Sequence, residues 1–133
     1  GKWILGICLG MQLFLSYGLE SGKTSGLGLV SGKVKKFNKK NKNIKLPHVG
    51  WNNLNLKKKE TKIFDKINLN SDYYFVHSFE CILDNKDDIL TTSYYEYEFT
   101  SSLIKNNLIG MQFHPEKSNP HGLKILKNFS NLD

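Results

Sequence analysis

The sequence contains no arginine, although it has 19 lysines and a net charge of +7. Many of the lysines lie in two runs, residues 33–45, where asparagine is interspersed, and residues 57–62. Proteins that read base edges or bind a phosphate through two hydrogen bonds favour the forked guanidinium group of arginine. We therefore expect no nucleic-acid partner, and we interpret the lysines as a solvated surface.

Long hydrophobic runs and metal motifs are also missing. No stretch of 18 apolar residues occurs, so we expect no membrane partner. The two cysteines, Cys8 and Cys81, show neither metal-ligand spacing nor a disulfide framework, which favours a cytoplasmic location. Cys81 is expected to be an ordinary structural residue. The glycines of residues 22–28 indicate a loop but do not match a phosphate-binding pattern.

The first motif that carries chemistry is Gly6-Ile7-Cys8-Leu9-Gly10. An apolar run precedes it, and apolar residues at helical spacing follow it, which predicts a strand, a sharp turn and a helix over residues 9–17. This is the arrangement of a nucleophile elbow, in which the flanking glycines leave room for close backbone contacts. A helix N-terminus would favour the thiolate of Cys8. The alternative is a buried cysteine that acts as a small hydrophobic residue.

The second motif is His114-Pro115-Glu116. Residues two apart on an extended segment point to the same side, so the carboxylate of Glu116 can orient the imidazole of His114. Such a ring could then act as a base on a thiol brought close by the fold. The alternative is a solvated surface loop. His77 is a weaker candidate base because no Pro-Glu follows it, and we expect it to pack in the core.

The remaining patterns predict the scaffold. Strands are predicted at residues 29–37, 72–81 and 89–93, and a hairpin is predicted from residues 99–104 and 108–113. Residues 38–43 are expected to form a turn, and residues 57–70 a short helix or turn. A final helix begins at Pro120, with the apolar residues Leu123, Ile125, Leu126 and Phe129 expected on its buried side.

Together, several segments resemble the class I (triad) glutamine amidotransferases. They are LGICLGMQLF (5–14), GLGLVSGKVKKF (26–37), PHVGWN (47–52), YYFVHSF (73–79), GMQFHPEKS (110–118) and GLKILKNF (122–129). The third and fourth are similar to the glutaminase subunit of imidazole glycerol phosphate synthase, from histidine biosynthesis. The resemblance implies an α/β fold, the flavodoxin-like three-layer sandwich of that family, lacking its N-terminal strands. Residues 1–133 would then be the C-terminal part of a single amidotransferase domain.

The resemblance also implies roles for individual residues. Cys8 would form a thioester with glutamine, and His114, held by Glu116, would move the protons. Leu9 would supply an oxyanion N–H. Gln12 and Glu20 would hold the substrate, Glu20 through its α-amino group. The backbone of Ser78 and Phe79 would bind the α-carboxylate, although the family more often has tyrosine at the position of Phe79. No metal or organic cofactor is implied.

The implied partners are glutamine and a synthase or cyclase subunit. That subunit would form a heterodimer with this chain and use the ammonia to make imidazole glycerol phosphate and an aminoimidazole carboxamide ribonucleotide. Val49, Trp51 and Lys117 would lie at the subunit interface.

Two alternatives remain at this point. The first is an amidotransferase that feeds another acceptor, such as a sugar of a surface glycan. The second is a non-catalytic, truncated remnant that acts as a binding module. A cysteine peptidase of similar fold is disfavoured, because Gln12 and Glu20 suit a free amino acid better than a peptide.

Overall fold

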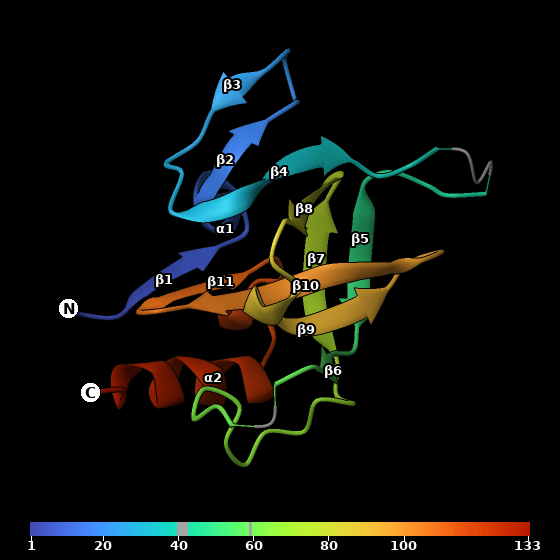
Figure 1. The fold of residues 1–133 in the computed structure, drawn as a ribbon. Coiled ribbons are helices and arrows are strands. Elements are labelled where there is room, and N and C mark those ends of the chain that lie inside the picture. Colours follow the sequence, from blue (N-terminus) through green and yellow to red (C-terminus); the bar gives the residue numbers. More distant parts are fainter. Residues whose placement is uncertain (40–42, 59) are drawn as a thin grey trace.

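The computed structural model describes residues 1–39, 43–58 and 60–133. A mixed sheet of nine strands runs in the order β1-β11-β10-β8-β4-β2-β3, with β9 paired to β10 and β6 paired to β9 (Figure 1). Its strands are β1 (Ile4–Ile7), β2 (Leu15–Gly18), β3 (Thr24–Ser25), β4 (Val30–Lys36), β6 (Asn55–Leu56), β8 (Phe79–Leu83), β9 (Ile89–Tyr94), β10 (Glu98–Lys105) and β11 (Leu108–Met111). The predicted strands at 29–37 and 89–93 and the predicted hairpin are confirmed.

The parallel strands β1 and β11 bring two distant parts of the sequence together at one edge of the sheet. Ile4 lies opposite Leu108 and Ile7 lies opposite Met111, so the carboxyl ends of both strands meet at one edge of the sheet. Cys8 follows β1 directly, and its N–H donates to the Met111 carbonyl at 2.7 Å. The residues after β11 therefore lie beside Cys8, although they are far away in the sequence.

Helices cover both faces of this pair. Successive residues of a strand point to opposite faces. On β11, a Cβ at Gly110 would meet the side chain of Met11 in helix α1 (Leu9–Leu13), whereas Ile109 and Met111 share a core cluster with Ile125 of helix α2 (His121–Ser130). The order helix, sheet, helix agrees with the predicted three-layer α/β sandwich.

The prediction of one helix over residues 9–17 is wrong in its second half. Helix α1 ends at Leu13, and β2 begins two residues later. Strand β2 pairs with β4 in parallel and with β3 in antiparallel orientation, and the N–H groups of Leu27 and Leu29 donate to the carbonyls of Leu13 and Phe14. The backbone groups of residues 13–18 therefore bond to residues 24–34 and not to the next helical turn. The predicted loop at 22–28 supplies β3.

The prediction of a single strand over residues 72–81 is also wrong. The segment forms β7 (Tyr73–His77) and β8 (Phe79–Leu83), which separate at Ser78. Strand β7 pairs with β5 (His48–Asn52) in a separate two-stranded sheet, whereas β8 joins the main sheet through β4 and β10. The chain therefore changes sheets at Ser78.

One of the four residues predicted for the buried side of helix α2 is exposed. Ile125 is fully buried, but Leu123 is 53% exposed. Successive residues of a helix are about 100° apart, so Leu123 and Ile125 lie on nearly opposite faces and cannot both point to the core. In Figure 1 the helix lies beneath β1 and β11.

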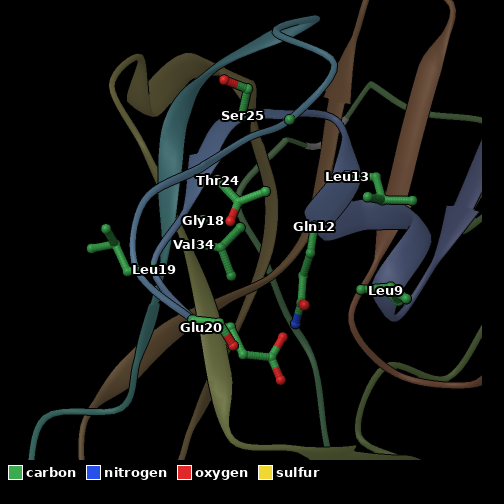
Figure 2. Close-up of a pocket in the computed structure, with 11 residues that line it drawn as sticks. Leu9, Gln12, Leu13, Gly18, Leu19, Glu20, Thr24, Ser25 and Val34 are labelled. Atoms are coloured by element: carbon green, nitrogen blue, oxygen red, sulfur yellow. The ribbon is translucent and has the colours of Figure 1, made fainter.

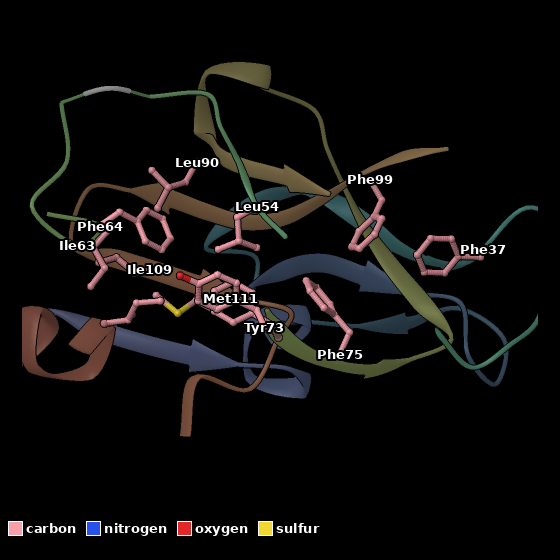
Figure 3. Close-up of a cluster of buried hydrophobic side chains, with 12 residues drawn as sticks. Phe37, Leu54, Ile63, Phe64, Tyr73, Phe75, Leu90, Phe99, Ile109 and Met111 are labelled. Atoms are coloured by element: carbon pink, nitrogen blue, oxygen red, sulfur yellow. The ribbon is translucent and has the colours of Figure 1, made fainter. Parts of the chain in front are cut away.

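Aromatic side chains make up half of the larger core cluster (Figure 3). It contains Phe37, Leu54, Ile63, Phe64, Tyr73, Phe75, Leu90, Phe99, Ile109, Met111, Phe113 and Ile125. Phe75 of β7 packs edge-on against Phe99 and Phe113, with ring centroids 5.8 and 5.7 Å apart. This packing fixes the small sheet against the main one. Cys81 lies in a second cluster with 1% exposure, which confirms its expected structural role.

Two predictions concern the polar segments. Over its described part, the segment at 57–70 forms turns, with no helix. The predicted turn at 38–43 includes residues 40–42, which lie outside the described residues. No helix in the described part of the chain has both the length and the apolar character needed to cross a bilayer.

Two buried histidines connect the small sheet with the turn at Ser78. His77 Nδ1 lies 2.9 Å from the Phe79 carbonyl, which can only accept, so this nitrogen carries the hydrogen. His77 Nε2 is then the acceptor for the Nδ1–H of His48, at 3.0 Å. Burial lowers the pKa of both rings to about 4. The predicted core role of His77 is confirmed.

This pair predicts acid sensitivity. Unfolded histidines titrate near 6.5, so between pH 6.5 and 4 the unfolded chain binds more protons than the folded one. Above about pH 6.5 both histidines are neutral in the folded and the unfolded chain, so protonation does not lower the free energy of unfolding there. The free energy of unfolding should fall by on the order of 6 kcal/mol, or about 3 kcal/mol for each ring, as the pH drops from 6.5 to 4. Urea denaturation at a series of pH values measures it. The double variant His48→Phe, His77→Leu should flatten the slope, and an unchanged slope would contradict the assignment.

Candidate active site

Cys8 occupies a strained turn between β1 and α1. Its backbone has φ 53° and ψ −107°, a conformation that non-glycine residues adopt only when the surrounding structure enforces it. A Cβ at Gly6 would meet the carbonyl carbon and oxygen of Gly10 at 2.7 Å, so Gly6 must lack a side chain. A Cβ at Gly10 would meet nothing within 4 Å. The expected steric need for glycine therefore applies to Gly6 and not to Gly10.

His114 and Glu116 form the expected pair at the end of β11. The ring Nδ1 of His114 lies 2.6 Å from Glu116 Oε1, on the short 3-10 helix η2 (Pro115–Lys117). A carboxylate accepts, so Nδ1 donates and Nε2 is the ring nitrogen left to take up a proton. The backbone N–H of His114 donates to the Tyr74 carbonyl at 2.9 Å, which anchors this segment to β7.

Strand β7 brings Cys8 and His114 near each other. The Cys8 sulfur lies 4.0 Å from the Val76 carbonyl, and the His114 N–H binds the Tyr74 carbonyl. Residues two apart on a strand are about 6.6–6.8 Å apart. The thiol and the imidazole segment therefore contact neighbouring positions of one strand.

The electrostatics of Cys8 differ from the prediction. Burial raises the pKa of the Cys8 thiol, and this effect exceeds the lowering by the Leu9 N–H and the Gln112 amide. Glu116 raises the pKa further, and Lys117 lowers it. The prediction that the helix N-terminus favours the thiolate of Cys8 is therefore wrong. Helix α1 has only five residues, so few peptide dipoles align behind the sulfur.

Gln112 is a site residue that the motif analysis missed. It is fully buried, and its Nε2 lies 3.6 Å from the Cys8 sulfur. Its Oε1 accepts from Gln12 Nε2 at 3.2 Å. The signal was present in the sequence, because Gln112 is a polar residue in an apolar strand pattern, two positions before His114.

A pocket of about 220 Å³ lies next to this cluster (Figure 2). It is lined by Leu9, Gln12, Leu13, Gly18, Leu19, Glu20, Ser21, Thr24, Ser25, Gly26 and Val34. Figure 2 shows the amide of Gln12 and the carboxylate of Glu20 directed into the same space. The structure thus unites Leu9, Gln12 and Glu20.

Ser78 and Phe79 do not join them. Neither is part of this lining. The Ser78 carbonyl accepts from the Phe37 N–H, and the Phe79 carbonyl accepts from His77. Both residues therefore support the turn between β7 and β8 in this structure.

The residues predicted for an interface share one surface. Val49 and Trp51 are 57% and 56% exposed on β5, and they lie opposite Val76 and Tyr74 of β7. The Tyr74 ring contacts Trp51, with ring centroids 5.4 Å apart, and Lys117 Nζ lies 5.7 Å from its centre. Tyr74, which the sequence analysis did not select, is the centre of this surface.

Among residues 1–39, 43–58 and 60–133, no group of three or more histidine, cysteine or acidic side chains could hold a metal ion.

Several known proteins resemble this chain. The imidazole glycerol phosphate synthase subunit HisH of Pelagibacter ubique is 50% identical over 131 residues, covering 98% of this chain and 62% of that protein. HisH of Pyrococcus furiosus is 47% identical, covering 99% and 66%. The chain thus spans less than two thirds of the length of these curated relatives.

A solved structure shares the fold. The crystal structure of a protein assigned as a GMP synthase subunit, from Thermoplasma acidophilum, has a TM-score of 0.64 and 23% identity, covering 96% of this chain and 55% of that one. At this identity the likeness concerns the fold alone. A family model described as "Glutamine amidotransferase class-I" matches residues 1–132. The chain therefore belongs to the class-I glutamine amidotransferase family.

Proposed function

We propose that this protein is the glutaminase subunit of an imidazole glycerol phosphate synthase. The observation that carries the proposal is the placement of the Cys8 thiol and the paired His114 and Glu116 against neighbouring residues of β7, beside a small pocket that holds Gln12 and Glu20. The similarity to HisH proteins, at 50% and 47% identity to two of them, supports the choice within the family.

The proposed reaction begins with Cys8. Burial keeps its thiol protonated at neutral pH, so the proton must leave as the sulfur attacks the side-chain amide carbon of glutamine. His114 takes this proton on Nε2, because Glu116 holds Nδ1. The ring then gives the proton to the departing ammonia, and a thioester remains. Water activated by the same nitrogen hydrolyses the thioester.

The Leu9 N–H is proposed as one donor to the oxyanion. A hydrogen bond from this N–H lowers the pKa of the Cys8 thiol. The N–H lies at the start of α1, beside the attacking atom. Donors fixed in this way stabilise the negative oxygen that develops in the transition state.

Substrate recognition follows from the pocket. The Nε2 of Gln12 is engaged by Gln112, which leaves the Oε1 of Gln12 as an acceptor near the carboxylate of Glu20. Two such acceptors suit the α-ammonium group of an amino acid. The backbone of Ser78 and Phe79 is proposed to receive the α-carboxylate once substrate is bound.

The ammonia needs a receiver, because free ammonia is protonated and diluted in water. We assign the surface of Val49, Trp51 and Lys117, centred on Tyr74, to a synthase or cyclase subunit that forms a heterodimer with this chain. The product would be imidazole glycerol phosphate, together with an aminoimidazole carboxamide ribonucleotide. The chain would form the C-terminal part of a single amidotransferase domain, need no cofactor, and act in the cytoplasm, where its two free thiols stay reduced.

A glutamine-analogue electrophile tests the site. A chloroketone that carries the α-amino and α-carboxyl groups of glutamine should alkylate Cys8, because the pocket orients it toward the sulfur. Peptide mass spectrometry reads the product, and excess glutamine should protect the thiol. The matched control is a chloroketone without the α-amino group, which should react far more slowly. Equal labelling by both reagents, or no protection by glutamine, would contradict a glutaminase site.

A further inference from the structure

We propose that Gln112 is a positioning residue: its side-chain amide contacts both the Cys8 sulfur and the Gln12 amide and fixes their positions relative to each other. The inference rests on the proposed function, because it concerns the same site. In this proposal, the buried amide of Gln112 connects the Cys8 sulfur with the substrate pocket.

The backbone of Gln112 is rigidly held. The residue directly follows β11, and its N–H donates to the Ser101 carbonyl at 2.9 Å. Its side chain is fully buried, where an unpaired amide group would carry a large free-energy cost. Both ends of the amide are paired, since Nε2 faces the sulfur at 3.6 Å and Oε1 accepts from Gln12 at 3.2 Å.

The two ends of the Gln112 amide have different hydrogen-bonding roles, because the nitrogen donates and the oxygen accepts. With its nitrogen towards Cys8, Gln112 offers a hydrogen-bond donor to the sulfur, and a donor stabilises a thiolate. The Val76 carbonyl on the other side, 4.0 Å from the sulfur, is only an acceptor and suits the neutral thiol. The amide of Gln112 therefore offsets part of the burial that opposes ionisation of Cys8.

The same amide sets the orientation of Gln12. Because Gln112 Oε1 accepts from Gln12 Nε2, the carbonyl oxygen of Gln12 is the end left for a ligand. That oxygen and the Glu20 carboxylate belong to the same pocket (Figure 2). If Gln112 lost its amide, Gln12 could rotate and present a donor to an ammonium group, which repels it.

The experiment uses the full-length protein with Gln112→Met, a near-isostere without an amide, and Gln112→Asn, whose shorter amide cannot reach both neighbours. Alkylation of Cys8 by iodoacetamide is followed against pH by peptide mass spectrometry. We expect the midpoint of the profile to rise by about one pH unit in both variants, which is about tenfold less thiolate at a given pH below it. The KM for glutamine should rise about tenfold, as expected for one lost orienting hydrogen bond.

Thr91→Val is the matched control. Thr91 is also fully buried, and its hydroxyl bonds the Ser101 side chain at 2.8 Å, next to the backbone partner of Gln112. The substitution removes a buried hydroxyl without touching the Gln112 amide, so the alkylation midpoint and KM should stay at wild-type values. A shift of the same size in this variant would mean that Gln112 acts only through packing, and would overturn the inference.

Two further outcomes separate the inference from the proposed function. Wild-type alkylation midpoints in either folded Gln112 variant, with folding checked by circular dichroism, would overturn the role of Gln112 even if the protein hydrolyses glutamine. Failure of the wild type to release ammonia with its synthase partner would overturn the glutaminase proposal. The upward shift of the alkylation midpoint would still support the contact between Gln112 and Cys8.

Discussion

Cys8→Ala is expected to abolish ammonia release from glutamine, with a loss of about 10⁴-fold or more in kcat. The sulfur is the only atom at this sheet edge proposed to form the thioester, and alanine removes it without adding bulk to the strained turn. Coupled assays with the synthase partner measure the effect. Added ammonium salts should restore product formation, since the acceptor enzyme is unaffected.

The control for this prediction is Cys81→Ala. Cys81 is buried in the second core cluster, so its replacement should lower stability modestly and leave glutamine hydrolysis intact. Residual glutamine-dependent activity of Cys8→Ala within about tenfold of the wild type would show that another group is the nucleophile.

The second large effect is expected for His114→Asn, with a loss of about 10³–10⁴-fold in kcat. Proton transfer by a positioned side chain contributes about 10²–10⁴-fold, and here the same ring serves both thioester formation and its hydrolysis. Asparagine can still donate to Glu116, so the η2 segment should keep its position while the proton shuttle is lost. Rapid-quench measurement of the thioester separates the two steps, and both should slow.

His121→Asn is the matched control for that variant. His121 begins helix α2, where it has no part in the proposed chemistry, and its replacement should leave kcat unchanged. If His114→Asn retained more than about a tenth of wild-type activity, the base would have to be another group. His77 is not that group on geometric grounds, because both of its ring nitrogens are engaged in the core.

The sequence predicted those site features that are local. The elbow at Cys8 and the pair of His114 and Glu116 each depend on a few adjacent residues, whose spacing can be read directly. Gln112 was missed because its role depends on contacts with Cys8 and Gln12 across the parallel pair of β1 and β11. The sequence marks Gln112 as a polar residue in an apolar strand, but it does not show that β1 pairs with β11 and brings Cys8 beside it.

The errors in the fold have a similar cause. Residues 9–17 have helical periodicity, but from Leu15 onward the pairing with β4 and β3 gives the backbone groups other partners. The break at Ser78 follows from β7 and β8 joining different sheets. The thiolate prediction failed because it weighed a helix dipole without knowing how deeply the sulfur is buried or how soon α1 ends.

Gly6 shows how an inactive variant of this protein could be misread. Gly6 packs against the Gly10 carbonyl on the far side of the strained Cys8 turn, yet it is not among the residues that line the pocket. A methyl group at Gly6 would push the two arms of the elbow apart and displace the sulfur, so an assay alone would report a chemical defect. A mutational survey that scores only turnover would therefore count a scaffold residue among the reacting groups.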